Sequence, residues 1–284
     1  MLRLIAGIVG LGFILVLTIS LITGASTFIS EGKQETVESK FYLAPKHVEF
    51  ASDGPFGKYD RQQLQRGFQV YKEVCAACHG LNLVAFRNLQ EIGYSEAEVK
   101  AIADQWQIEV PTINPETGEA TTRKATPADR FPDPYANETA GRAANNNAYP
   151  PDLSLMTKAR HHGSAYVYSL LTGYRDPNTY RNEKGEALPA ELRPGQNLHF
   201  NPYFPNLNLA MPAPITADGQ VSYADGTNPT VDQMSKDVSA FLTWTAEPKL
   251  ENRHRTGVAV LIFLIIATVL GYFAYRNVWA DQKH

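Results

Sequence analysis

The stretch Cys75-Ala-Ala-Cys78-His79 holds the only two cysteines of this 284-residue chain and places a histidine directly after the second one. A C-x-x-C-H sequence is the attachment motif of c-type haem. The two thiols form thioethers to the haem vinyl groups, and the imidazole beside the second anchor becomes an axial ligand of the iron. The sequence therefore predicts one covalently bound haem c, held by Cys75, Cys78 and His79.

Two other chemistries use cysteines spaced in this way. A redox-active dithiol needs only the two thiols, so that the adjacent histidine would be coincidental. A zinc site needs a second pair of ligands, and the chain has no further cysteine. Haem attachment is the interpretation that uses all three side chains, and it leaves no thiol for a disulfide.

The residues before the motif are typical of an amphipathic helix. Asp60 is a suitable N-cap, and apolar side chains follow at spacings of four, three, four and three, which place them on one helical face. They are Leu64, Phe68, Tyr71, Cys75 and Cys78. The two haem anchors therefore continue an apolar stripe.

The ligand on the other face of the iron decides what the haem does. A histidine favours a low reduction potential, a methionine favours a higher one, and an open position indicates ligand binding or catalysis. Met211 lies outside any predicted helix, in LNLAMPAPI, where Pro212 and Pro214 hold the backbone extended. We expect Met211 to be this ligand. The alternatives are Met156, His161, His162 and His199.

Apolar runs near both ends flank a polar middle. Residues 256–275 carry no charge over 20 positions, which at about 1.5 Å per residue matches the roughly 30 Å hydrocarbon layer of a bilayer. We predict a transmembrane helix there; a buried core helix of this length rarely stays apolar on all sides. The short segment 276–284 is expected to be a cytoplasmic tail.

Near the N-terminus, an apolar run at 4–22 follows Arg3 and ends in Thr23-Gly-Ala25-Ser26, where small residues suit a signal peptidase. Residues 1–25 are therefore expected to be a cleaved signal peptide or an uncleaved membrane segment. With either alternative, residues 31–250 are exported to the far side of the membrane, where we expect them to form the haem domain.

Within that domain the pattern alternates between helices and long loops. We expect an extended surface loop at 108–149, a helical segment at 153–171, a further loop at 172–228 and an amphipathic helix from Val231 to Trp244. Met234 lies on the apolar stripe of that last helix and is expected in the core. Arg160, in the helical segment, can pair with a haem propionate or face solvent.

These stretches together resemble the cytochrome c1 family, the haem subunits of ubiquinol-cytochrome c oxidoreductase (bc1) complexes, in a bacterial form. The matching stretches are FGKYDRQQLQRGFQVYKEVCAACHG, YPPDLSLMTKARHHGSAYVYSLLTGYRDP, LAMPAPI and DGTNPTVDQMSKDVSAFLTWTAEPK. They occur in the family's order and are followed by the C-terminal apolar run.

The resemblance implies a mainly α fold, a cytochrome c-like haem domain with long loop insertions, in which the helix before the haem motif crosses the helix that ends near Trp244. It implies that His79 and Met211 are the axial ligands and that Arg160 and Tyr166 lie near the haem propionates. Some bacterial relatives carry a further cysteine pair in the insertion before the methionine. This chain has none, so packing must hold the loop between Thr172 and Leu209.

The implied function is electron transfer, with no bond-breaking chemistry in this subunit. One electron would pass from the Rieske iron-sulfur protein to the haem and on to a soluble or membrane-anchored cytochrome c. Cytochrome b and the lipid bilayer are further expected partners, and no nucleic acid is expected. The location implied is the cell inner membrane, crossed once, with the haem domain on the periplasmic side. Some relatives are fused to cytochrome b, so the N-terminal run is alternatively an inherited junction.

Other classes of haem protein share part of this pattern. A membrane-bound cytochrome subunit of a nitric oxide reductase or terminal oxidase has the haem, the methionine and the anchor, but should lack the PPDLS and AEPK stretches. A haem-based sensor or peroxidase needs an open or displaceable sixth position.

Residues 31–250 carry 27 acidic and 21 basic side chains, and this acidic excess predicts electrostatic steering of a basic cytochrome c.

Overall fold

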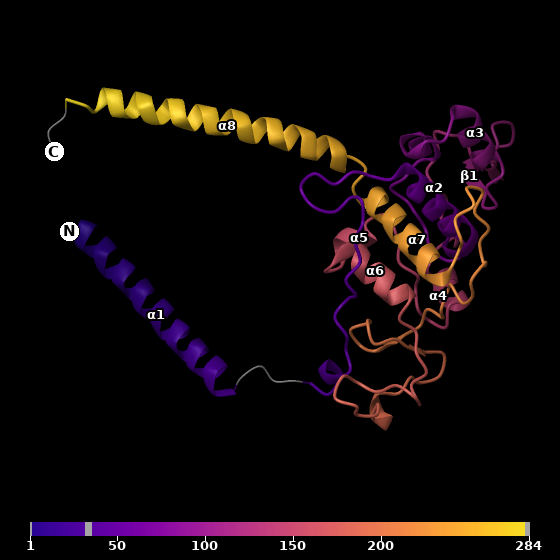
Figure 1. The fold of residues 1–284 in the computed structure, drawn as a ribbon, viewed down its shortest axis with the longest axis horizontal. Coiled ribbons are helices and arrows are strands. Elements are labelled where there is room, and N and C mark those ends of the chain that lie inside the picture. The colour runs from indigo at the N-terminus through magenta and orange to yellow at the C-terminus, as the bar shows by residue number, and fades with distance from the viewer. Residues whose placement is uncertain (1, 32–35, 282–284) are drawn as a thin grey trace.

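The computed structural model describes residues 2–31 and 36–281 and shows a helical domain between two long helices at the ends of the chain (Figure 1). The α-helices are α1 (Leu2–Glu31), α2 (Arg61–Val70), α3 (Glu96–Asp104), α4 (Glu138–Ala144), α5 (Met156–Ala159), α6 (Gly163–Leu171), α7 (Val231–Ala246) and α8 (Leu250–Val278). Short 3-10 helices cover Glu38–Lys40, Phe86–Ile92 and Ala190–Leu192, and a single π turn covers Tyr71–Cys75. The fold is mainly α, as predicted.

The strands are few and short. β1 (Val110–Ile113) pairs antiparallel with β2 (Ala120–Arg123), with Val110 opposite Arg123. β3 (His199–Phe200) pairs antiparallel with β4 (Asn208–Leu209). Both pairs lie in the insertions between helices.

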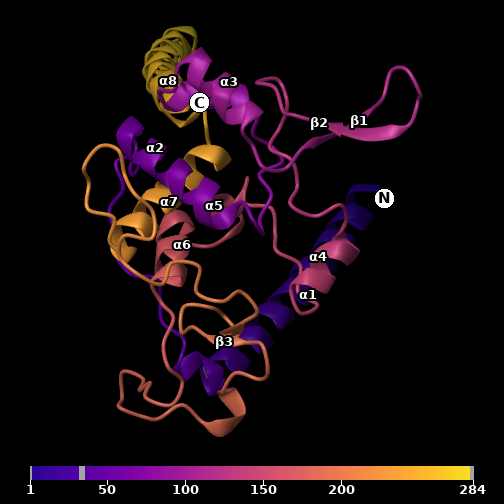
Figure 2. The same ribbon diagram turned by 90° about the vertical axis from the view of Figure 1, so that its right-hand side faces the viewer.

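The centre of the domain is the crossing of α2 and α7, which lie side by side in both views (Figure 2). The predicted cap is confirmed, because the Asp60 carboxylate accepts hydrogen bonds from the backbone N–H groups of Gln62 and Gln63 at 3.0 and 3.2 Å. At the crossing, a Cβ atom on Gly67 would lie 2.1 Å from the carbonyl oxygen of Asp237. Glycine therefore allows the two backbones to meet, and the crossing implied by the resemblance is confirmed.

Aromatic side chains fill the core around this crossing. The ring centroids of Phe86 and Phe131 are 4.2 Å apart, and those of Phe68 and Phe241 are 5.7 Å apart. Met234 is fully buried, which confirms its predicted place in the core. The helix before the haem motif is thereby fixed against α7.

Two predicted elements were wrong in part. The stretch 108–149 is not a plain loop, because it contains the β1–β2 hairpin and α4; the Asn137 side chain caps α4 and Gly118, at φ +72°, allows the hairpin turn. The predicted helix at 153–171 is broken between α5 and α6. His162 and Gly163 adopt φ +66° and +48° there, which no right-handed helix can contain.

The stretch 172–228 is mostly loop, as predicted, with one 3-10 helix and the β3–β4 pair, and it packs around a small second core. The buried apolar residues of this core are Leu188, Leu192, Phe200 and Leu207 from the insertion and Phe41 from the segment before α2. The buried Asn201 ties this insertion to α6, since its side-chain amide donates a hydrogen bond to the Leu170 carbonyl at 2.7 Å. Packing and hydrogen bonding hold this loop, as the absence of a cysteine pair requires.

The two end helices expose their side chains along most of their length. Arg3–Ser30 and Leu250–Val278 are both long and apolar enough to cross a membrane. α8 contains the predicted transmembrane segment 256–275 and begins before it. Residues 32–35, at the start of the predicted haem domain, and residues 282–284 of the predicted tail lie outside the described residues, as does Met1.

Candidate haem site

The haem-attachment motif follows a change of helical geometry at the end of α2. The N–H of Ala76 donates to the Tyr71 carbonyl at 2.8 Å, five residues earlier, so the last turn is a π turn. The N–H groups of Cys78 and His79 then both donate to the Cys75 carbonyl, at 3.1 and 2.9 Å. π turns are rare and recur at functional sites. Here Cys75 is the last residue of the π turn and Cys78 follows it, and both cysteines remain partly exposed.

The His79 imidazole is oriented by a single backbone acceptor. Its Nδ1 atom lies 2.8 Å from the carbonyl oxygen of Pro151. Because a carbonyl oxygen only accepts, Nδ1 must carry the proton, and the neutral ring then has its lone pair on Nε2. Burial lowers the pKa of His79 and favours this neutral form. A histidine that binds a metal is commonly fixed in this way, through the ring nitrogen that does not bind the metal.

The segment that carries the Pro151 carbonyl is held against the residues after His79. The Asp152 carboxylate accepts hydrogen bonds from the N–H groups of Asn82 at 2.7 Å and Ser154 at 2.9 Å. The Leu153 N–H donates to the Gly80 carbonyl at 3.0 Å. A Cβ on Gly80 would lie 2.4 Å from a carboxylate oxygen of Asp133 and 3.3 Å from one of Asp152, so a larger residue would require these side chains to shift. Residues 80–82 and 151–154 are therefore held together, and this fixes the Pro151 carbonyl that orients the imidazole.

The surroundings of Cys75 do not favour a redox dithiol. Burial raises the pKa of the Cys75 thiol to about 12, whereas a reactive cysteine has its pKa lowered so that the thiolate forms near neutral pH. A zinc site finds no support either. Among residues 2–31 and 36–281, no group of three or more His, Cys, Asp or Glu side chains is placed to hold a metal ion.

Met211 lies in a partly buried bend, outside any helix, as its sequence context predicted. The Tyr174 hydroxyl donates a hydrogen bond to its backbone carbonyl at 2.9 Å, and Ile215, four residues on, is buried in the main core. The backbone is therefore held on both sides of the thioether. Its role as an iron ligand stays a prediction.

The alternative sixth ligands occupy different surroundings. Met156 begins α5 and packs against the main core. His161 and His162 are exposed in the break between α5 and α6. His199 lies in β3, opposite Leu209. Met211 differs from all four in that a proline-stiffened loop presents it.

Arg160 and Tyr166 lie close together around the break between α5 and α6. Arg160 is exposed, donates to the Ala159 carbonyl at 3.1 Å and forms no ion pair within the described part of the chain. Tyr166 is buried; its burial raises the pKa of the phenol, while the charge and a hydrogen bond of Arg160 oppose that shift. An arginine without a carboxylate partner beside a phenol is a suitable donor pair for a propionate.

Two contacts of this site were not predicted from sequence. They are the Pro151 carbonyl, which orients His79, and the Tyr174 hydroxyl, which holds the Met211 backbone. The prolines at 150 and 151 indicated a stiff segment, but nothing in the sequence showed which side chain it would meet. No comparable pattern marked Tyr174.

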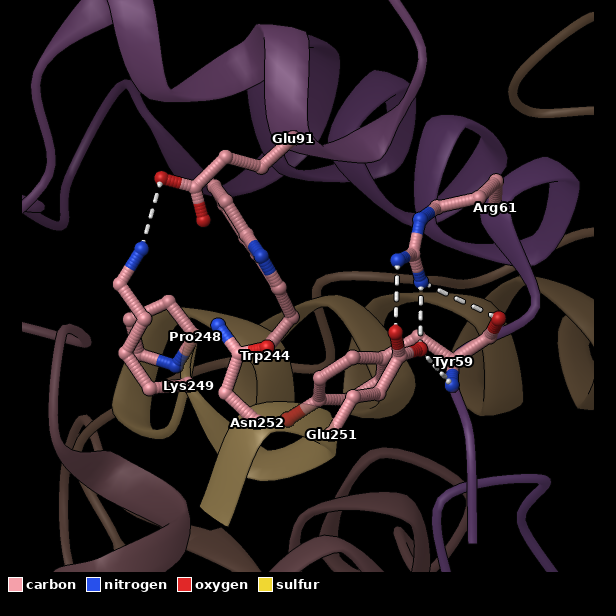
Figure 3. A pocket seen from close by; sticks show the side chains of 8 residues that line it. All are labelled: Tyr59, Arg61, Glu91, Trp244, Pro248, Lys249, Glu251 and Asn252. Carbon is pink, nitrogen blue, oxygen red and sulfur yellow. Dashed lines mark hydrogen bonds and ion pairs between the residues drawn. The ribbon is translucent and has the colours of Figure 1, made fainter. Parts of the chain in front are cut away.

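The described structure also contains a cleft of about 320 Å³, where α7 meets α8 (Figure 3). Its lining residues are Tyr59, Arg61, Glu91, Trp244, Pro248, Lys249, Glu251 and Asn252. None of the predicted haem residues lines it. This cleft therefore belongs to the junction of α7 and α8 and not to the candidate haem site.

A family model described as the cytochrome C1 family matches residues 50–282. The chain belongs to the cytochrome c1 family. Cytochrome c1 of Rhodospirillum rubrum is 44% identical over 236 residues, which cover 81% of this chain and 86% of the relative. The cytochrome b-c1 complex catalytic subunit of Candida albicans is 41% identical over 242 residues, covering 85% and 80%.

A further member, the cytochrome b/c1 of Bradyrhizobium diazoefficiens, is 46% identical over 240 residues. The match covers 81% of this chain and 34% of that protein, so the chain spans about a third of its length. The family inferred from the sequence motifs is thus confirmed, and so is the mainly α fold with a C-terminal apolar helix. The C-x-x-C-H motif, the PPDLS segment and Met211 all lie inside the matched residues.

Proposed function

We propose that this chain is the membrane-anchored electron-transfer subunit of a quinol-cytochrome c oxidoreductase, carrying one covalently bound haem c. Membership of the cytochrome c1 family and the names of its relatives, two of which mention cytochrome b, support this assignment. A haem held at this site would take up and release one electron at a time. The observation that carries the proposal is the His79 imidazole, adjacent to both cysteines and fixed with Nε2 free.

Six residues of the chain would hold the haem. Cys75 and Cys78 would anchor it, His79 and Met211 would supply an imidazole and a thioether to the iron, and Arg160 would pair with a propionate to which the Tyr166 hydroxyl donates a hydrogen bond. A thioether is a weak donor and favours the reduced iron relative to an imidazole. This ligand pair would give the haem a potential suited to accepting an electron from a Rieske protein and passing it to a cytochrome c.

The membrane topology follows from the two apolar helices. α8 anchors the chain in the cell inner membrane, and the haem domain lies on the periplasmic side, where it meets the Rieske protein and cytochrome c. Cytochrome b is the partner within the bilayer. The acidic excess of residues 31–250 would steer a basic cytochrome c, so that its association rate falls as salt increases.

Affinity purification of the full chain from mildly solubilised membranes tests the proposal. We expect a cytochrome b and a Rieske protein to copurify, and the preparation to reduce cytochrome c with quinol. Recovery with a copper or di-iron oxidase core instead would contradict the assignment and favour the oxidase class. Stopped-flow reduction of cytochrome c at several ionic strengths tests the steering separately, and a rate independent of salt would rule it out.

A further inference from the structure

The segment that precedes α2 passes beside the first turns of the anchor helix α8 (Figure 1). The Nδ1 atom of His254, in the second turn of α8, lies 3.3 Å from the carbonyl oxygen of Gly57. These two residues are 197 positions apart in sequence. A turn formed by residues 51–58 is thus placed directly against the start of the predicted membrane span; we refer to it as the Phe56 turn.

Several contacts fix the residues just after the Phe56 turn to α8 and to the residues before it. The Arg61 guanidinium donates to both carboxylate oxygens of Glu251, at 2.9 and 3.0 Å (Figure 3). The Tyr59 N–H donates to the same carboxylate at 2.8 Å, and the Tyr59 hydroxyl donates to the Glu247 carbonyl at 2.8 Å. A bidentate arginine-carboxylate pair constrains geometry as well as distance. The chain that leaves the Phe56 turn is therefore held to the first turn of α8 and to the residues just before it.

The Phe56 turn is itself ordered by internal hydrogen bonds. The Phe50 N–H donates to the Asp53 carboxylate at 2.8 Å, and the Lys58 N–H donates to the Ala51 carbonyl at 2.8 Å. A Cβ on Gly57 would lie 2.2 Å from the Ser52 carbonyl oxygen, so the chain folds back tightly. At the tip, the Phe56 side chain is 77% exposed. The protein thus builds a defined turn and presents an unpacked aromatic ring on it.

The contact with His254 sets the depth of the backbone of the Phe56 turn relative to the membrane. The uncharged run begins at Thr256, two residues after His254, which is about 3 Å at the helical rise of about 1.5 Å per residue. The polar interface on each side of the hydrocarbon is roughly 5–7 Å thick. The Phe56 turn therefore lies at interface depth whenever α8 spans the bilayer.

We propose that the Phe56 turn inserts its aromatic ring into the phospholipid interface beside α8, as a second membrane contact of the haem domain. Single exposed apolar side chains are common and need no explanation, but this one lies at interface depth, and Phe is among the side chains that interfacial segments bury at the boundary of headgroups and acyl chains. Together with α8 it restrains the tilt of the haem domain. The inference rests on the proposed membrane anchoring by α8.

Site-directed spin labelling of the full chain in nanodiscs of phosphatidylcholine and phosphatidylglycerol tests this inference. Labels are attached to Phe56→Cys, to Leu264→Cys within α8 and to Ile113→Cys. Ile113 is a matched control, since it is 68% exposed and lies in the hairpin on the side of the domain away from α8 (Figure 1). Power saturation then compares accessibility to oxygen, which concentrates in lipid, with accessibility to a water-soluble nickel chelate.

We expect the Leu264 label to favour oxygen strongly, the Ile113 label to favour the nickel chelate, and the Phe56 label to show a several-fold lower nickel accessibility than Ile113. Equal accessibility at Phe56 and Ile113, with a shielded Leu264, would overturn the inference alone. A water-accessible Leu264 would instead contradict the anchoring on which the inference rests. Shielding of Phe56 only when other membrane subunits are present would assign it to a protein contact and also overturn the proposal.

Discussion

The Nδ1 atom of His79 lies 2.8 Å from the carbonyl oxygen of Pro151, across 72 residues of sequence. This one contact selects the tautomer of the imidazole and leaves Nε2 as the atom that can bind a metal. The carbonyl is fixed because the carboxylate of the next residue, Asp152, accepts hydrogen bonds from the N–H groups of Asn82 and Ser154. The orientation of the predicted ligand therefore depends on a carboxylate whose hydrogen bonds go to the backbone of Asn82 and Ser154.

The first prediction concerns that carboxylate. Asp152→Ala removes the acceptor of the Asn82 and Ser154 N–H groups, and each hydrogen bond to a charged group contributes about 1.5–3 kcal/mol. We expect a lower free energy of unfolding and an altered midpoint potential, because His79 loses its fixed orientation. Chemical denaturation and redox titration measure the two effects.

A matched control is Asp176→Ala. Asp176 also accepts hydrogen bonds from a nearby residue, the N–H and side-chain amide of Asn178 at 2.9 and 3.0 Å, in an exposed turn of the insertion. This variant should leave the midpoint potential unchanged. If both variants shift the potential equally, or neither does, Asp152 has no special role in positioning His79.

The second prediction concerns Met211. Met211→His should leave the haem covalently attached but lower its midpoint potential by a substantial part of the roughly 0.8 V that axial ligands command. Met211→Leu should open the sixth position, so that the reduced protein binds carbon monoxide. Redox titration and a carbon monoxide difference spectrum measure these results. An unchanged potential without carbon monoxide binding would assign the sixth position to Met156 or to one of the histidines.

A third prediction follows from the crossing of α2 and α7. Gly67→Ala places a Cβ 2.1 Å from the Asp237 carbonyl oxygen and 2.7 Å from the Phe241 Cβ, so the helices must separate. Overpacking of this kind costs about 1–3 kcal/mol. Thermal unfolding of the purified protein should show a clear loss of stability. Gly195→Ala, which meets only a Leu198 methyl group at 4.0 Å, should change it by less than about 0.5 kcal/mol; equal effects would contradict the tight crossing.

The fourth prediction concerns acid stability. Hydrogen bonds from Arg123 and Thr126 hold the pKa of Asp129 well below its usual range. A carboxylate with a lowered pKa in the folded state contributes stability above its unfolded pKa of about 3.9, and this contribution is lost as the pH falls. Asp129→Asn should therefore be less stable than the parent near neutral pH, with a difference that shrinks below about pH 4.

Unfolding curves at several pH values measure this difference. Glu116→Gln, at an exposed position in the β1–β2 turn, controls for the loss of one negative charge. A destabilisation by Asp129→Asn that stays constant down to pH 2 would show that the carboxylate acts by shape and not through its charge.

Local sequence patterns predicted the elements that are stabilised locally or by one amphipathic face. Asp60 indicated the start of α2, and the apolar stripe through Met234 indicated α7. The break at His162 was missed because a residue with positive φ needs tertiary support that apolar periodicity does not show. The β1–β2 hairpin was missed because its strands are short and mostly exposed, so they lack a clear alternation of apolar and polar residues.

The candidate site likewise combines residues that a local pattern predicts with contacts that depend on tertiary packing. Cys75, Cys78 and His79 were predicted because the chemistry requires a fixed local spacing. The contacts of Pro151 and Tyr174 depend on how distant segments pack, and neither spacing nor composition encodes them. Met211 was predicted because prolines mark the loop that presents it.

The most direct test of the central claim is to ask whether Cys75 and Cys78 carry a haem. The full chain is purified from its native membranes, denatured, treated with iodoacetamide and analysed by intact mass spectrometry, beside the Cys75→Ser/Cys78→Ser double variant. We expect the parent to retain the mass of one haem with no alkylated cysteine, and the double variant to lose the haem. Two alkylated cysteines in the parent, with no haem retained after denaturation, would contradict the account.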